Sequence, residues 1–192
     1  MFAYLDGDLT HKSPSLLHLN VNGVGYEVNI TLQTYIKIQA LEKFRLYTHL
    51  QIREDAWVLY GFAEEQERST FRQLLGINGV GAVTARIILS SLTPEELERA
   101  VAMEDVQTLE KVKGIGAKTA QRIVLELKGK LVKGKNSASI QAFTHNTTLE
   151  DALNALVNLG INKAAAEAAI KKVKDAATLP VEEIIKQALR AL

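Results

Sequence analysis

The chain has 192 residues, of which 47% are hydrophobic, and its net charge at pH 7 is only +1. This length accommodates one large domain or two to three small ones with buried cores. Because the chain has no cysteine, disulfides, thiolate zinc sites and iron–sulfur clusters held by cysteine are excluded. No apolar run approaches the ~18 residues that span a membrane, and the start of the chain lacks the features of a secretion signal. We therefore expect a cytoplasmic protein that makes no membrane contact.

Residues 1–62 contain five short segments with β-type patterns. Glycines and polar turn residues, such as Asn22-Gly23, separate these segments. Short strands interrupted by turn signals at this spacing are typical of a small barrel. We therefore predict a β-barrel domain over 1–62, with strands at 2–9, 17–21, 26–30, 44–52 and 57–62.

Helical signals begin at Ala63 and continue to Lys130. The clearest helix start is Thr93-Pro94-Glu95-Glu96, which offers an N-cap, a proline at the first helical position and two acids in the first turn. Four or five short helices are expected here. They form the predicted second domain, residues 63–132.

One short pattern occurs twice in this helical region: LLGINGVGAVTARII at 74–88 is followed by LEKVKGIGAKTAQRI at 109–123. Each copy places Gly-apolar-Gly between two helical segments, at 79–81 and at 114–116. Glycine tolerates positive φ, and the helix that follows begins with unpaired N–H groups. Those groups and the helix dipole form an anion site that suits phosphate. The pattern resembles the helix-hairpin-helix motif of proteins that bind DNA without sequence specificity.

A single Gly-x-Gly between helices is common as a plain turn, so the repetition carries the prediction of DNA binding. A P-loop is excluded, because Val112 and Ala117 occupy the positions where its glycines would precede Lys118. Seven basic residues and one acid, Glu126, lie between Lys111 and Lys133, and this basic block adjoins the second copy. We predict contacts to the DNA backbone rather than to bases. The predicted contact residues are Asn78, Gly79, Val80, Gly81, Ala82, Gly114, Ile115, Gly116, Ala117, Lys118, Thr119 and Arg122.

The last part of the chain is predicted to be a flexible linker followed by a small helical bundle. Residues 133–146, KGKNSASIQAFTHN, are polar and aperiodic, which predicts a flexible linker. Thr147-Thr148-Leu149-Glu150 fits a capping box that opens a helix ended by Gly160. Two further helices, from about Lys163 and from Pro180, complete a predicted three-helix bundle over 147–192. A domain this small is expected to leave some apolar surface for a partner.

In combination these features resemble the RuvA family of bacterial proteins that recognise Holliday junctions, over nearly the whole chain. The resemblance is carried by Asn22–Val28 (NGVGYEV), Arg53–Ala56 (REDA), Leu59–Phe62 (LYGF), the two hairpins, the linker and the bundle. It implies an α+β multidomain fold. The expected parts are an N-terminal OB-fold-like β-barrel, a central tandem helix-hairpin-helix domain and a C-terminal three-helix bundle of the UBA-like type.

The resemblance also implies a function without catalysis. A homotetramer would hold a four-way DNA junction open, and Glu54 and Asp55 would form an acidic pin near its centre that repels phosphates. Arg53 would contact phosphate beside the pin; without the resemblance, Arg53–Asp55 would be interpreted as a solvated turn. Family members often carry lysine just after the first pair of glycines, where this chain has Ala82-Val83. Side-chain charge is therefore expected only at the second hairpin.

The resemblance further implies that the C-terminal bundle binds RuvB, an ATP-driven motor, and that ATP hydrolysis belongs to this partner. We expect the contact at an apolar patch around Leu156, Leu159 and Ile161, with the junction resolvase RuvC as a further partner. No cofactor or metal is expected.

Two other functions compete with this interpretation. A repair glycosylase or lyase of the helix-hairpin-helix type would need a catalytic acid after the second hairpin, but the first aspartate there is Asp151, beyond the linker. The four histidines have no metal-ligand spacing. A protein-only adaptor, in which the hairpins merely pack, would bind no DNA.

Overall fold

The computed structural model describes residues 2–138, 146–173, 176 and 179–191. It divides into two compact units, Met1–Gly134 and Lys135–Leu192.

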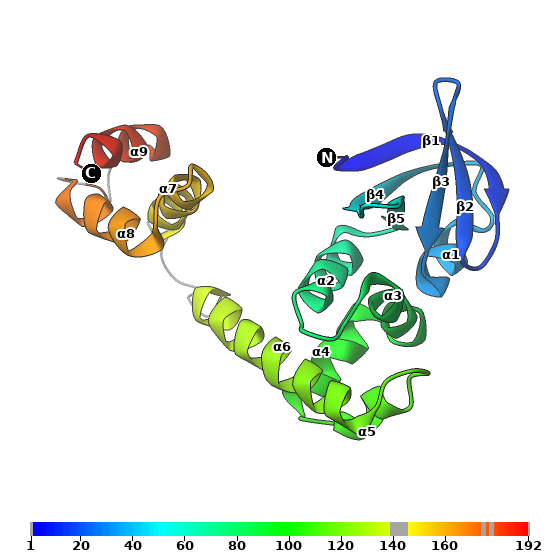
Figure 1. Cartoon of the computed structure of the whole chain (residues 1–192). Helices are drawn as coiled ribbons and strands as arrows, with labels where there is room; N and C mark the ends of the chain where they lie inside the picture. Colours follow the sequence, from blue (N-terminus) through cyan, green and yellow to red (C-terminus); the bar gives the residue numbers. More distant parts are fainter. Residues whose placement is uncertain (1, 139–145, 174–175, 177–178, 192) are drawn as a thin grey trace. The chain divides into compact units, whose positions relative to one another are not determined.

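The first unit begins with the predicted barrel (Figure 1). Its five strands close in the order β1-β2-β3-β5-β4, with β3 and β5 parallel and every other neighbouring pair antiparallel. Leu17, Leu19, Val28 and Leu46 are fully buried in its core, as expected from side chains that alternate along each strand. The strands are β1 (Tyr4–Lys12), β2 (Leu16–Val21), β3 (Val24–Ile30), β4 (Lys43–Ile52) and β5 (Trp57–Phe62).

Helix α1 (Leu32–Ile38) lies between β3 and β4 in the chain and was not predicted from the sequence. Thr31 caps it by accepting a hydrogen bond from the Thr34 N–H at 3.0 Å, and Ile38 is buried in the barrel core. The helix has only seven residues. Its stability therefore comes from the cap and from burial, because isolated helices this short are unstable.

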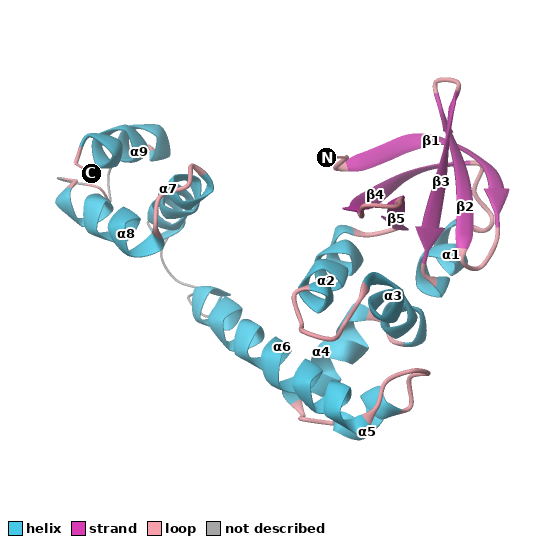
Figure 2. Ribbon diagram, in the orientation of Figure 1, coloured by secondary structure: helices cyan, strands magenta, loops and turns pink. Residues whose placement is uncertain are grey.

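Five helices complete the first unit (Figure 2). Phe71 on α2 packs against Phe62 and Tyr60 on β5, with ring centroids 4.9 and 5.1 Å apart. One continuous apolar cluster thus runs from β5 through α2 into the later helices. The expected start at Thr93 is confirmed, with both hydrogen bonds of a capping box. The helices are α2 (Glu65–Leu75), α3 (Ala82–Ser91), α4 (Pro94–Ala102), α5 (Val106–Glu110) and α6 (Ala117–Ala138).

In its described residues, the second unit has three helices around a core that includes Leu156, Ala166, Ala169 and Ala188. Gly160 has φ +91°, which only glycine adopts readily, and it follows the first of these helices as predicted. The helices are α7 (Asn146–Asn158), α8 (Lys163–Lys172) and α9 (Val181–Arg190).

Two local expectations differ from the structure. Helix α6 continues to Ala138, so 133–138 is helical where an aperiodic linker was expected. Intrinsic propensity does not explain the continuation, because Gly134, Asn136 and Ser137 are poor helix formers. Helix α7 begins at Asn146, which places Thr147 inside the helix rather than at its cap. The rest of the predicted linker, 139–145, lies outside the described residues.

Candidate nucleic-acid interface

The two repeated turns have the same backbone geometry. Gly79 has φ +89° and Gly114 has φ +86°. In the first turn the Val80 N–H donates to the Ile77 carbonyl at 3.0 Å. In the second, the Ile115 N–H donates to the Val112 carbonyl, also at 3.0 Å. The repeat in the sequence is therefore a repeat in structure, as predicted from the paired glycines.

Buried side chains anchor each turn from within. Val80 and Ile115, which were predicted as DNA contacts, are only 5% and 6% exposed, so they offer their main chain rather than their side chains to a ligand. Ala82, another predicted contact, is fully buried. Ala85 and Ala120, one turn into the helices that follow, are fully buried. Because alanine carries only a methyl group, the two helices of each hairpin can pack close together at these positions.

The N-termini of the helices that follow Gly81 and Gly116 face open space. Gly81 is the N-cap of α3 and provides no side-chain acceptor. A methyl group built at Gly81 or at Gly116 would meet no atom within 4 Å. The first N–H groups of a helix have no intrahelical partner, and they carry the positive end of the helix dipole. Both turns therefore offer an accessible site for an anion such as phosphate.

The two hairpins differ in the side chain that follows the turn. Val83 and Lys118 occupy the same place in the two copies, each being the second residue of its helix. Val83 is 54% exposed, and Lys118 is also exposed. A side-chain charge is thus available at the second hairpin, while the first presents an apolar side chain at the corresponding position. This matches the inequality expected from the sequence.

Arg122 connects the second hairpin to the first. Its Nη1 donates a hydrogen bond to the carbonyl oxygen of Asn78 at 2.9 Å. From the sequence, Arg122 was predicted only as a DNA contact, because this bond joins residues far apart in the chain. The guanidinium carries five N–H donors, so it can hold the first turn and still present donors to solvent. Arg122 therefore fixes one turn against the other.

Arg86 connects the first hairpin to the barrel. From α3, its Nη1 donates to Asn29 Oδ1 at 2.7 Å and to the Ser15 carbonyl at 3.1 Å. Close by, the Leu32 N–H donates to Ser90 Oγ at 3.1 Å. None of these residues was singled out from the sequence. Together they tie the first hairpin helix to the strands and to α1.

The residues of the expected acidic pin lie at the tip of the β4–β5 hairpin. Ile52 pairs with Trp57 at the end of the ladder, and the Arg53 N–H donates to the Ala56 carbonyl at 2.9 Å to close the turn. Glu54 and Asp55 are exposed. Within the described part of the chain neither carboxylate has an ion-pair partner. The tip therefore keeps both negative charges available to act on whatever approaches it.

In the second unit, the three residues expected to form one apolar patch do not share a surface. Leu156 is fully buried in the core, because its place on α7 faces both other helices. Ile161 is partly buried against the same core, and Leu159 is 64% exposed. Leu156 is thus a core residue rather than a surface contact.

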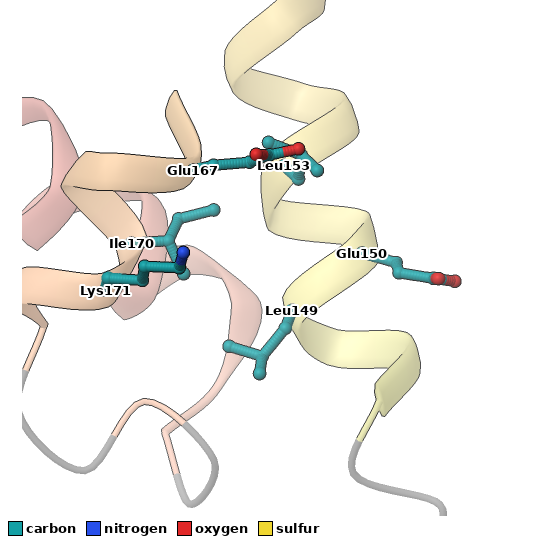
Figure 3. Close-up of a pocket in the computed structure, with 6 residues that line it drawn as sticks. All are labelled: Leu149, Glu150, Leu153, Glu167, Ile170 and Lys171. Atoms are coloured by element: carbon teal, nitrogen blue, oxygen red, sulfur yellow. The ribbon is translucent and has the colours of Figure 1, made fainter. Parts of the chain in front are cut away.

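A shallow hollow lies elsewhere on this unit, between α7 and α8. Figure 3 shows Leu149 on α7 and Ile170 on α8 directed into the space between these helices, whereas Glu150 points away from α8. The other residues that line the hollow are Leu153, Glu167 and Lys171. This hollow was not predicted from the sequence, because it depends on how two helices pack.

Among the described residues, no group of three or more histidine, aspartate or glutamate side chains is placed to hold a metal ion. No helix in the described ranges is long and apolar enough to cross a membrane.

Comparison with known proteins agrees with this arrangement. The RuvA N-terminal domain matches residues 1–61, and the RuvA C-terminal domain matches 147–192. A relative from Christiangramia forsetii, named Holliday junction branch migration complex subunit RuvA, is 46% identical over 193 residues and covers 100% of both chains. The chain belongs to the RuvA family. The resemblance inferred from the sequence is therefore confirmed.

Other members of the RuvA family extend the comparison. Relatives of the same name from Leptothrix cholodnii and Cytophaga hutchinsonii are 48% and 41% identical, over 193 and 197 residues, and each covers at least 99% of both chains. Residues 71–130 match the model of a SAM-like helix-hairpin-helix tandem. This range contains both repeated turns and the bond between Arg122 and Asn78.

Proposed function

We propose that this chain is a non-catalytic subunit that binds four-way DNA junctions and holds them open for branch migration. The observation that carries the proposal is the pair of equivalent hairpin turns, each with an open helix start and a glycine at positive φ. The names of the relatives, which refer to a Holliday junction branch migration complex, supply the class of DNA. ATP hydrolysis belongs to a partner.

Affinity comes from the two turns. The N–H groups that follow Gly81 and Gly116 each take one phosphate oxygen, because a helix start provides donors and a positive partial charge. Lys118 adds a charge-assisted contact at the second turn, and Arg122 keeps the two turns at a fixed separation. These contacts reach the backbone and not the base edges, so they are indifferent to sequence. This is what a branch point that moves along DNA requires.

Preference for a junction comes from Glu54 and Asp55. Two carboxylates at one tip repel phosphates, so a continuous duplex laid across them loses binding energy. A junction opened at its centre leaves a space where the tip can sit. Arg53, beside the pair, contacts a phosphate of a strand that leaves this space.

The assembly proposed for the chain is a homotetramer, whose symmetry corresponds to the four arms of the junction. The second unit binds RuvB, the motor ATPase, through Leu159, with the α7–α8 hollow as a second apolar surface. Residues 133–146 provide the linker between the DNA-binding part and the part that binds the motor. RuvC is a further partner on the junction, and the complex acts in the cytoplasm.

Titration of a dye-labelled four-way junction and of a duplex of equal length, at several salt concentrations, tests the proposal. We expect tighter binding to the junction at every salt concentration and a log–log salt dependence that reports several phosphate contacts. Equal affinity for both DNAs would overturn the assignment. Absence of any DNA binding would favour the protein-only adaptor.

A further inference from the structure

The β4–β5 hairpin carries an exposed indole that the fold does not use. Trp57 is the only tryptophan of the chain. It is 76% exposed, and its cross-strand partner Ile52 is 64% exposed. Large side chains such as tryptophan contribute most to stability or binding when they are buried. A large uncovered apolar pair next to a charged turn therefore marks a surface that contacts something else.

The strand register explains why this pair is uncovered. Leu50 pairs with Leu59, and both pack in the barrel core. Residues two apart on a strand share a face, so Ile52 and Trp57 continue the row formed by Leu50 and Leu59. The hairpin extends past the barrel by this one pair. In the part of the chain that the structure describes, the last two members of the row lie beyond the core that would bury them.

The surroundings of the pair favour a nucleobase over a second protein surface. In the proposed function, the neighbouring Glu54 and Asp55 lie in the opened centre of the junction, where DNA strands separate. Without further apolar neighbours, two side chains supply far less than the ~800 Å² per partner of a stable protein interface. The residues that follow Ile52 are the charged Arg53, Glu54 and Asp55, and charged residues are depleted from interface cores. The carboxylates repel phosphate, but they do not repel the uncharged face of a base. A strand that passes the tip therefore presents its bases to the indole.

We propose that Trp57 stacks on an unpaired base at the branch point, with Ile52 supporting the indole from the neighbouring strand. This inference rests on the proposed function. Base–aromatic stacking tolerates any sequence because every base has a π-face. Trp57 therefore stabilises the opened centre without fixing the branch point at a preferred sequence. The ligand class is a single-stranded nucleobase of DNA.

The fluorescence of the chain reports on this contact directly, since Trp57 is its only tryptophan. Junction and duplex are titrated into the protein, and binding is followed separately by anisotropy of a dye on a distal DNA arm. We expect tryptophan quenching that saturates together with junction binding, and none at equal saturation with duplex. Unchanged emission with bound junction would overturn the inference but leave the proposed function intact. Absence of junction binding by anisotropy would contradict the proposed function itself.

Quenching or a blue shift that depends on protein concentration without DNA would mean that another copy covers the indole, and this would also overturn the inference.

Substitutions of Trp57 separate the contribution of aromatic stacking from that of side-chain size. Trp57→Gln should weaken junction binding about tenfold and leave duplex binding unchanged, while Trp57→Phe should retain most of the affinity. Met103→Gln removes an equally exposed apolar side chain on the helical part and is the matched control. Equal losses for Trp57→Gln and Met103→Gln would contradict a specific contact.

Discussion

Arg122 Nη1 donates a hydrogen bond of 2.9 Å to the main-chain carbonyl of Asn78, so the helix of the second hairpin holds the turn of the first. Gly79, the next residue, has φ +89° and begins the anion site of that turn. In the proposed function, Arg122 thus links the two phosphate sites and adds a positive charge beside them. The number of phosphates engaged together would then depend on this link.

Replacing Arg122 with lysine separates the effect of the hydrogen bond to Asn78 from the effect of the positive charge. Lysine keeps the positive charge but lacks the planar fork that reaches the Asn78 carbonyl. We expect Arg122→Lys to weaken junction binding about fivefold to tenfold, in keeping with the ~1 kcal/mol of a typical hydrogen bond, and to reduce the slope of its salt dependence. Arg99→Lys, the same substitution at an exposed site on α4 that the proposal does not use, is the control and should change affinity little. Wild-type affinity in Arg122→Lys would mean that charge alone matters.

The first hairpin can be given the charge that it lacks. Val83 stands where the second hairpin has Lys118, and it is 54% exposed, so lysine fits there without disturbing the core. Val83→Lys should tighten binding to both junction and duplex and steepen the salt dependence by ~0.9 in log–log slope. Val83→Gln controls for the loss of the apolar side chain. An unchanged slope would show that the first turn lies away from phosphate.

Arg86 and Asn29 should couple in stability. Their hydrogen bond of 2.7 Å joins α3 to the barrel. We expect Arg86→Gln to lower the free energy of unfolding by about 1–3 kcal/mol. The Ser15 carbonyl also loses one of its two donors and keeps only the Ile30 N–H, at 3.1 Å. A double-mutant cycle with Asn29→Ala, measured by urea unfolding, should give a coupling of ~1 kcal/mol. Additive effects would exclude a direct interaction.

Glu67 should make stability depend on pH. Burial raises the pKa of its carboxyl above the ordinary value of 4.5, against hydrogen bonds donated by the Thr31 and Thr34 hydroxyls. The folded chain therefore keeps a proton that the unfolded chain has already released. The contribution of this group to stability falls as pH rises from the ordinary glutamate range through the raised pKa.

Urea unfolding of the wild type and of Glu67→Gln across this pH range checks the sign. The stability of the wild type relative to the variant should be highest at low pH and should decline as pH rises. A difference that is constant with pH would contradict the raised pKa.

Local chemistry explains which features could be predicted from the sequence. The turns at Gly79 and Gly114 depend on a residue type that alone accepts their φ, and the cap at Thr93 depends on neighbours in the chain. The barrel follows from alternation along each strand. Each of these features is determined by residues that lie close together in the sequence, so the sequence pattern predicts the structure correctly.

The missed features depend on contacts between distant segments. The bonds of Arg86 to Asn29 and of Arg122 to Asn78 join residues that no local pattern relates. Leu156 was expected at a surface because its apolar character fits either role, and only helix packing places it in the core. The base-stacking role proposed for Trp57 likewise required the strand register.

We propose that the hairpins supply affinity for DNA, while Glu54 and Asp55 supply preference for a junction. The ratio of junction to duplex affinity in Glu54→Gln/Asp55→Asn separates these two roles. We expect duplex binding to rise about fivefold at low salt, equivalent to ~1 kcal/mol of relieved repulsion, so that the ratio falls. Glu42→Gln/Glu98→Gln, which makes the same change of charge at two other exposed sites, should leave the ratio unchanged. An unchanged ratio in the Glu54/Asp55 variant would contradict the claim.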